Sequence, residues 1–271
     1  MEVTKKYELK TYYANECCSF RKTKEEYGGL SNMASGFPLN INGINVLSSE
    51  ALYQTCRFPH LPEVQKKIIS ERSPMSAKMV GKPFRTNSRP DWDEVKIKIM
   101  RWCLRVKIAQ NFMLFGQLLE STQNRPIVED SNKDDFWGAV RSKDDQNVLI
   151  GVNALGRLLM ELRQFYNEKR FSYDMFVVKP LNIPDFKFYG SLIRTIDERE
   201  NFISYISKSI KYYEINNKNP YSSNNLHNEF GIHNNVLNDP EVPYKVTKKE
   251  KKEKKLGNNK KDVEQQASLP L

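Results

Sequence analysis

The sequence predicts an α+β fold that is rich in helix and contains a few short strands. Of its 271 residues, 39% are hydrophobic, which is enough to bury a full core in one or two domains. Two long stretches, from Asp91 to Ala109 and from Asn153 to Tyr166, repeat apolar residues at helical spacing. Strand-like patterns are confined to three short segments. Helices therefore supply most of the predicted core.

The first predicted helices have recognisable starts. Ser48 or Ser49 can accept a hydrogen bond from a backbone N–H at the start of the helix that carries Glu50. Ser73 followed by Pro74 opens a second helix, because serine suits the cap position and proline the first helical position. Both starts predict helices in the first third of the chain.

Two longer helices follow, each with one apolar face. Asp91, with Glu94 three residues later, resembles a capping box at the start of the first. Asn153 is expected to cap the second. The buried faces are predicted to hold Val95, Ile99, Trp102, Val106 and Ala109 in the first helix and Leu155, Leu158, Leu159 and Leu162 in the second.

Strands are predicted at three places. The segment LNINGINVL, residues 39–47, contains the turn Asn42-Gly43 between two apolar runs and reads as a hairpin. PIVE at residues 126–129 and NVLIGV at residues 147–152 have the length and composition of short strands.

Composition divides the chain into three parts: a globular domain at residues 12–166, an appendix packed on it at residues 167–214, and a flexible Asn-rich and Lys-rich tail at residues 215–271. From Lys245 to Lys261, nine lysines stand against two glutamates, so +7 of the net charge of +10 belongs to the tail and about +3 to everything else. The tail is either a solvated terminus or a nonspecific tether for nucleic-acid phosphates.

The chain is expected to be soluble and cytoplasmic. No apolar run approaches the roughly 20 residues of a membrane helix, and the first residues lack the apolar core of a signal peptide. The spacing of the four cysteines suits no zinc site, so neither a metal nor a cofactor is predicted. Only His60 lies in the globular half, which makes a Ser/His or Cys/His nucleophile improbable.

Glu50 is the first candidate for chemistry. It lies in the first turn of its helix, where free N–H groups and the helix dipole stabilise a negative charge by up to about 1 kcal/mol. An ionised carboxylate there suits a base, or the partner of a developing positive charge. The same position also suits a glutamate that only stabilises the helix start.

Two further clusters could bind a nucleotide. In DSNKDDFWGAV, an extended backbone would point Asp135 and Trp137 to the same side, which would place a carboxylate beside a ring. The alternative is a core tryptophan. A basic stretch suits a diphosphate or an ordinary surface loop, and it contains Lys78, Lys82, Arg85 and Arg89 before Trp92.

The segment GGLSN is a third candidate. Gly28 and Gly29 allow close backbone approach, and Ser31 and Asn32 offer hydrogen bonds to ribose hydroxyls. A tight turn with no ligand would have the same composition.

Six segments in one order resemble the NADAR family, also called the YbiA-like family, from near Tyr27 to Arg163. They are GGLSNM, SSEALYQTCRF, AKMVGKPFRTNSRPDW, MRWCLRVKIAQN, DDFWGAV and GVNALGRLLMELR. The resemblance implies a compact helix-rich α+β fold and N-glycosidase activity. One branch of the family cleaves early intermediates of riboflavin biosynthesis. Another removes ADP-ribose from guanine in DNA and so acts as antitoxin to a DNA ADP-ribosyltransferase.

The resemblance also implies roles for individual residues. The functional glutamate of the family falls on Glu50, its acid-x-Trp pair on Asp135 and Trp137, and a typical lysine on Lys78. The ligand would be lined by Gly29, Leu30, Ser31, Asn32, Tyr53, Gln54, Arg85, Trp92 and Asn153.

The sequence departs from the riboflavin-type pattern Glu-His-x-Tyr-Gln, because residues 50–54 read Glu-Ala-Leu-Tyr-Gln. This departure favours the DNA branch, with ADP-ribosylated DNA as the partner. The alternatives are a hydrolase of phosphorylated riboflavin intermediates and a module that binds ADP-ribose or NAD without cleaving it.

Two mechanisms stay open at this point. Glu50 could stabilise a positively charged ribose carbon while Asp135 serves as the second carboxylate. In the other mechanism, Lys78 attacks the anomeric carbon as a neutral amine and forms a Schiff base.

Overall fold

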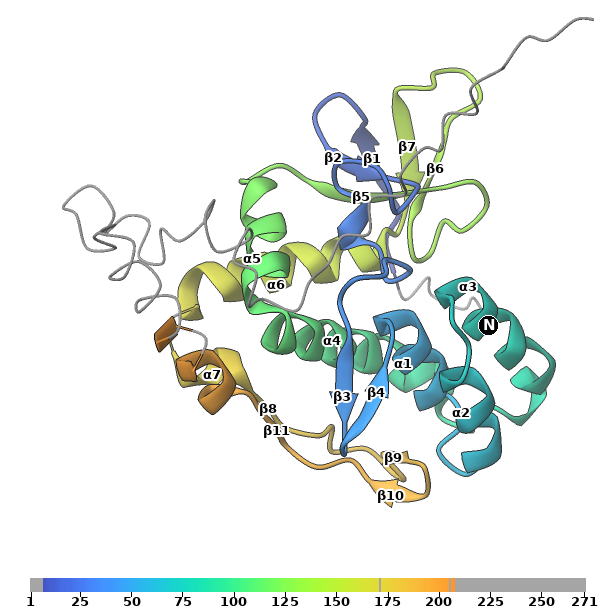
Figure 1. Cartoon of the computed structure of the whole chain (residues 1–271). Helices are drawn as coiled ribbons and strands as arrows, with labels where there is room; N and C mark the ends of the chain where they lie inside the picture. The colour runs from blue at the N-terminus through green and yellow to red at the C-terminus, as the bar shows by residue number, and fades with distance from the viewer. Residues whose placement is uncertain (1–6, 171, 205, 208–271) are drawn as a thin grey trace, which may run out of the picture.

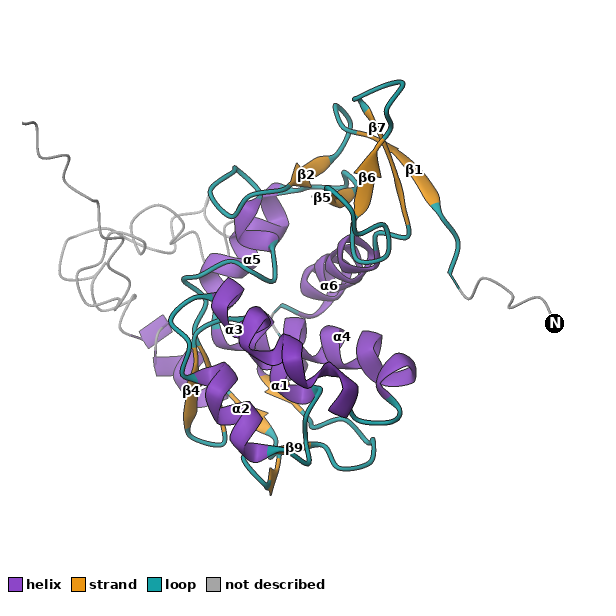
Figure 2. Ribbon diagram, turned by 90° about the vertical axis from the view of Figure 1, so that its right-hand side faces the viewer, coloured by secondary structure: helices purple, strands orange, loops and turns teal. Residues whose placement is uncertain are grey.

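A mixed five-stranded sheet lies at one end of the molecule, and most of the helices lie to one side of it (Figures 1 and 2). The computed structural model describes residues 7–170, 172–204 and 206–207. Its helices outweigh its strands, which confirms the α+β class. The strands in spatial order are β1 (Lys10–Tyr13), β7 (Val148–Gly151), β6 (Ala139–Arg141), β5 (Ile127–Ser131) and β2 (Cys18–Phe20).

The sheet is antiparallel at one edge and parallel at the other. β7 pairs antiparallel with both β1 and β6, whereas β5 pairs parallel with both β6 and β2. A parallel neighbour cannot be reached by a tight hairpin. The connection from β5 to β6, residues 132–138, must therefore return along the sheet before β6 begins.

Helix α4 runs through the centre of the hydrophobic core, and α6 lies between α4 and the sheet (Figure 1). The apolar faces predicted for both helices are buried, as expected from their periodicity. The helices are η1 (Gly28–Leu30), α1 (Ser49–Cys56), α2 (Pro62–Ile69), α3 (Pro74–Gly81), η2 (Lys82–Asn87), α4 (Trp92–Gln110), α5 (Phe112–Ser121), α6 (Ala154–Lys169) and α7 (Tyr173–Phe176).

The predicted serine caps of α1 and α3 are confirmed, whereas the predicted side-chain cap of α4 by Asp91 is wrong. The Ser48 hydroxyl accepts a hydrogen bond from the backbone N–H of Ala51 at the start of α1. The Ser73 hydroxyl accepts one from the backbone N–H of Ser76 at the start of α3. Asp91 occupies the N-cap position of α4, but its side chain caps no backbone N–H. Its carboxylate instead pairs with the guanidinium of Arg89 at 2.5 Å and 2.9 Å. A charged partner two residues away outcompetes the helix terminus for the carboxylate.

The predicted hairpin is present, with strands β3 (Leu39–Ile41) and β4 (Ile44–Val46). Asn42 and Gly43 have φ values of 52° and 87°, and two positive φ angles in a row are what a tight hairpin turn requires. The strands predicted near residues 126–129 and 147–152 are β5 and β7. Strands β1, β2 and β6 were not predicted, because these segments of three or four residues have neither the apolar run of β7 nor the turn that joins β3 to β4.

Residues beyond 166 share the main core. Phe186 and Phe188 are buried with the helices, and the Trp102 indole N–H donates to the carbonyl of Lys179 at 3.0 Å. The boundary at residue 166 stays a prediction. The predicted tail at residues 215–271 lies outside the described residues. Four short strands complete this part, namely β8 (Val177–Val178), β9 (Lys187–Phe188), β10 (Ser191–Leu192) and β11 (Ile196–Asp197).

Within the described part of the chain, none of the helices combines the length and the apolar character needed to span a membrane. All four cysteines are buried free thiols.

Candidate active site

A cavity of about 240 Å³ lies where α1, α3 and α4 meet β5 and the connection that follows it. We call it the Glu50 cavity. Residues predicted from the sequence that line it are Asn32, Glu50, Tyr53, Gln54, Lys78, Arg85 and Trp137. Its wall also contains Met33, Arg57, Met100, Glu129, Asp134 and Leu155, which were not predicted as site residues.

Glu50 is held from two sides by neutral amides. The residue is only 6% exposed. Its Oε2 accepts a hydrogen bond from Asn32 Nδ2 at 2.9 Å, and its Oε1 accepts one from Gln54 Nε2 at 2.8 Å. Together with the N–H groups at the start of α1, these donors stabilise the negative charge and fix the direction of the carboxylate.

Glu129 supplies a second carboxylate from the middle of β5. The connection after β5 returns past this strand and brings Asp134 and Trp137 into the same wall. Burial, together with the negative charges of Asp134 and Glu50, raises the pKa of Glu129 to about 7, although the charge of Lys78 opposes this shift. A carboxyl group with such a pKa can donate a proton near neutral pH.

Three cations line the cavity beside these carboxylates. The Arg57 guanidinium lies over the ring of Trp92, 4.0 Å from its centroid, and burial lowers its pKa. Lys78 projects from α3 and is half-buried, whereas Arg85 on η2 is exposed. Because the carboxylate of Glu50 is buried and Arg85 is exposed, the cavity leads from an acidic inner end to a rim that carries Arg85 and also the exposed Asp134. Guanidinium and ammonium groups at a rim suit phosphate oxygens.

Tyr53 and Trp137 form the aromatic part of the wall. The Tyr53 ring lies 5.6 Å from that of Trp137 in an edge-to-face arrangement, and 5.1 Å from that of Trp92. Burial raises the pKa of Tyr53, so its phenol stays neutral. Trp137 is half-buried and keeps ring surface at the cavity, where a base or a flavin precursor could stack.

Residues 19–166 match the model of the NADAR domain family, which covers more than half of the chain. The chain belongs to the NADAR domain family. It is 34% identical to the N-glycosidase YbiA of Escherichia coli over 146 residues, which are 54% of this chain and 86% of that protein. This relative supports the predicted class of hydrolases that act on N-glycosidic bonds.

One further relative carries a different name, and one solved structure is similar. A riboflavin biosynthesis protein of Vibrio vulnificus is 29% identical over 164 residues, which are 60% of this chain and 42% of that protein. The NMR structure of E. coli YbiA superimposes with a TM-score of 0.48 at 30% identity, covering 59% of this chain and 89% of the YbiA chain.

Most of the GGLSN segment of this NADAR domain lies behind the cavity. Leu30 is fully buried, and Ser31 is 5% exposed. A Cβ on Gly29 would lie 2.6 Å from Cδ2 of Leu118 on α5, so this leucine side chain would have to shift. Only Asn32 of this segment lines the cavity, and its side-chain amide donates a hydrogen bond to Glu50.

Asp135 and Trp92 also lie outside the cavity wall. Residues 135–137 form a turn, so the extended backbone that would align Asp135 with Trp137 does not exist, and Asp135 is exposed. Asp134 takes its place in the wall. Trp92 is 6% exposed and lies beneath Arg57, so it supports the wall without lining it.

Asn153 has a structural position instead of a ligand-binding one. It is completely buried, its Nδ2 donates to the carbonyl of Ile127 at 2.8 Å, and its Oδ1 accepts from the backbone N–H of Glu129 at 3.2 Å. The predicted side-chain cap of α6 is wrong because these bonds to β5 occupy the amide. Asn153 thus positions the backbone that carries Glu129.

Lys107 holds the loop that carries Asn32. It is fully buried, and its Nζ donates to the carbonyls of Gly29 at 2.9 Å and Ser31 at 3.2 Å. Burial lowers its pKa to about 7. We predict that Lys107→Met, which removes both hydrogen bonds, lowers kcat about 10-fold by loosening Asn32 and Glu50. Steady-state kinetics beside a urea unfolding curve test this, and a folded variant with unchanged kcat would contradict it.

No group of three or more His, Cys, Asp or Glu side chains in the described residues is arranged to hold a metal ion.

Proposed function

We propose that this NADAR domain hydrolyses the bond between ADP-ribose and guanine in DNA and so opposes a DNA ADP-ribosyltransferase toxin. The observation that carries the proposal is the buried Glu50 carboxylate, fixed by Asn32 and Gln54 in one wall with Glu129. Cleavage of an N-glycosidic bond needs a negative group for the ribose carbon and a proton for the leaving nitrogen. Two carboxyl groups in different environments can meet these two needs.

The chemistry divides between the two carboxyl groups. Glu129 gives its proton to the departing guanine nitrogen, which keeps the electron pair of the broken C–N bond. Glu50 stabilises the positive charge that develops at the ribose carbon. The oxygen of a water molecule then bonds to that carbon, and Glu50 accepts the proton that the water loses. The products are ADP-ribose and unmodified guanine.

The size and the rim of the cavity favour a substrate that lies mostly outside it. Sites that enclose a drug-sized ligand measure roughly 300–1,000 Å³, whereas the Glu50 cavity measures about 240 Å³. It can enclose the ribose and one attached group, with a diphosphate near Lys78 and the exposed Arg85. A guanine that is part of DNA must leave its stack to reach such a site.

A second candidate is hydrolysis of a phosphorylated intermediate of riboflavin biosynthesis. The name of the Vibrio relative favours it, and a single phosphate could bind the same cations. The departure from the riboflavin-type motif at residues 50–54 speaks against it. A third candidate, a module that binds ADP-ribose or NAD without cleaving it, would make no use of the paired carboxyl groups.

The decisive experiment offers the purified protein an oligonucleotide with ADP-ribosylated guanine and, separately, a phosphorylated riboflavin precursor. Release of ADP-ribose from the DNA alone supports the proposal. Release of ribose phosphate from the precursor alone supports the second candidate, hydrolysis of a riboflavin-biosynthesis intermediate. Binding without cleavage of either substrate would establish the binding module.

Lys78 takes part in both chemical routes, as a cation for the substrate or as the amine of a Schiff base. We therefore predict that Lys78→Met lowers kcat/KM by at least about 10²-fold. Lys82→Met is the matched control, since Lys82 is exposed and does not line the cavity. Unchanged kinetics of Lys78→Met would contradict the Schiff-base route and the role of Lys78 as a cation for the substrate.

Lys78→Arg then separates the routes, because arginine keeps the charge but forms no Schiff base. Activity in this variant, with no adduct after borohydride reduction of the wild-type reaction, supports the carboxylate route. An inactive variant and a mass increase on Lys78 support the Schiff base.

A further inference from the structure

A second cavity, of about 580 Å³, lies between β2, the loop at residues 21–27 and the opposite face of β5. Successive residues of a strand point to opposite faces. Glu129 therefore faces the Glu50 cavity, whereas the next residue, Asp130, faces the second one. We call it the Asp130 cavity. A single strand thus separates two polar cavities.

Asp130 fixes two arginines in this cavity. The residue is 6% exposed. Its Oδ1 accepts a hydrogen bond from Arg21 Nη2 at 2.6 Å, and its Oδ2 accepts one from Arg141 Nε at 2.8 Å. The buried carboxylate holds both guanidinium groups in place while each keeps N–H groups that Asp130 does not use.

Donors outnumber acceptors in this cavity. Arg125 uses its Nη2 on the Tyr27 hydroxyl, and Lys22 Nζ has no acceptor among the described residues. The Glu25 carboxylate is already engaged by the backbone N–H groups of Arg21 and Lys22 at 2.7 Å and 3.1 Å. These two bonds lower the pKa of Glu25.

Glu26 is the remaining carboxylate of the wall. Four cations therefore face three carboxylates, of which Asp130 and Glu25 are already engaged. The free guanidinium and ammonium N–H groups lack an anionic partner of the kind that a phosphate supplies.

We propose that the Asp130 cavity is a second, non-catalytic site that binds a phosphate group. The choice of ligand rests on the proposed function, since a polynucleotide substrate carries phosphates beyond the one nucleotide that the Glu50 cavity takes. The phosphate belongs either to the backbone of a DNA strand or to a free phosphate or nucleotide, and the same cations suit both.

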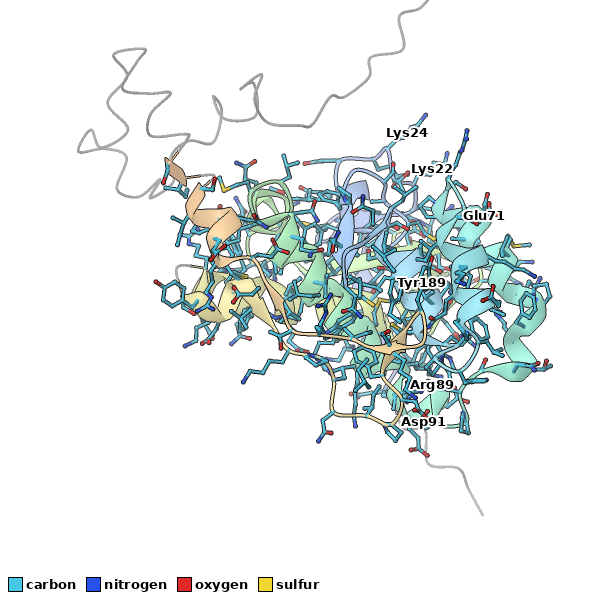
Figure 3. All side chains as sticks on the ribbon, turned by 60° about the horizontal axis from the view of Figure 1, so that its bottom comes forward. Lys22, Lys24, Glu71, Arg89, Asp91 and Tyr189 are labelled. Atoms are coloured by element: carbon cyan, nitrogen blue, oxygen red, sulfur yellow. The ribbon has the colours of Figure 1, made fainter. Side chains whose placement is uncertain are left out.

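The variants are chosen so that the Asp130 ion pairs stay intact. Arg125→Gln and Lys22→Gln each remove one cation of the cavity. Lys24→Gln is the matched control, because Lys24 belongs to the same loop, is exposed like Lys22 and lies at the same edge of the molecule (Figure 3), but does not line the cavity. Arg85→Gln removes a cation of the Glu50 cavity and reports binding there.

The first measurement is the thermal stability of the full chain in inorganic phosphate, compared with chloride of equal ionic strength. The second is the affinity for a short unmodified single-stranded oligonucleotide across a salt series. We expect Arg125→Gln and Lys22→Gln to weaken binding of at least one probe about 10-fold, and Lys24→Gln to change it less than twofold. For the oligonucleotide, loss of one phosphate contact also lowers the salt slope by about 0.7.

The two probes identify the source of the phosphate. An effect on the oligonucleotide alone assigns the site to the DNA backbone, and an effect on inorganic phosphate alone assigns it to a free phosphate. If Arg125→Gln and Lys22→Gln match Lys24→Gln for both probes, the second site does not exist. Neither probe is cleaved, so this result is independent of whether the protein hydrolyses ADP-ribosylated DNA.

Discussion

Replacing Glu50 with glutamine lowers kcat by about 10³-fold, because the neutral amide cannot stabilise a positive ribose carbon or accept a proton from water. The variant is expected to fold. Asn32 Oδ1 is buried and has no hydrogen-bond partner in the described part of the chain. If the Asn32 amide turns over, this oxygen can accept a hydrogen bond from the new NH₂ group. Single-turnover kinetics on ADP-ribosylated DNA measure the effect.

Glu63→Gln is the control for this loss, since it makes the same chemical change at an exposed side chain of α2. It should retain the wild-type rate. Equal rates for Glu50→Gln and Glu63→Gln, with the thermal unfolding of both unchanged, would rule out Glu50 as the catalytic carboxylate.

Replacing Glu129 with glutamine removes the proposed proton donor and is expected to lower kcat by about 10²- to 10⁴-fold at neutral pH. The pH profile gives a sharper test. The pKa of Glu129 is raised to about 7 by burial and by the charges of Asp134 and Glu50. The wild-type rate should therefore fall as pH rises through about 7, and the slow residual rate of Glu129→Gln should not show this fall.

Asp135→Asn distinguishes the structural assignment from the one that the family resemblance suggested. Asp135 is exposed and lies outside the wall of the cavity, so its variant should keep at least half of the wild-type rate. Loss of activity in Asp135→Asn with full activity in Glu129→Gln would show that Asp135, and not Glu129, is the second catalytic carboxylate.

The free energy of unfolding should change with pH through the same group. Glu129 has an ordinary pKa of 4.5 when unfolded and about 7 when folded, so the folded state binds more protons between these values. Stability therefore falls as pH rises from about 4.5 to 7 and then levels off. Glu129→Gln should be more stable than wild type at pH 8, by at most about 3 kcal/mol, and equal to it at pH 4. Urea unfolding at the two pH values checks the sign.

Features with local causes could be predicted from the sequence. The cap at Ser48 and the tight turn at Asn42-Gly43 each depend on a few neighbouring residues, and both are present. The apolar faces of α4 and α6 follow from a period that every turn of the helix repeats. Glu50 belongs with these, because its place in the first turn of α1 follows from the same local signals.

Local signals failed where a distant or charged partner competed. Asp91 has the right position for a cap but pairs with Arg89. Asn153 also has that position, yet its amide binds the backbone of β5, 24 and 26 residues earlier in the chain. Helix-start patterns do not include the competition from Arg89, although it is local, whereas the bonds of Asn153 depend on how α6 meets β5 in space.

The sequence by itself determined the fold class, the main helices, the family and one catalytic candidate, Glu50. Only the tertiary structure decided that Glu129 and Arg57 share the cavity with Glu50, and that Asp135 does not. The parallel pairing of β5 with β6 sends the connection between them back past β5, which brings Asp134 and Trp137 to Glu129. Glu50 and Glu129 are 79 residues apart and meet because α1 packs on α4, α4 on α6 and α6 on β5. No local pattern around Glu129 encodes this packing.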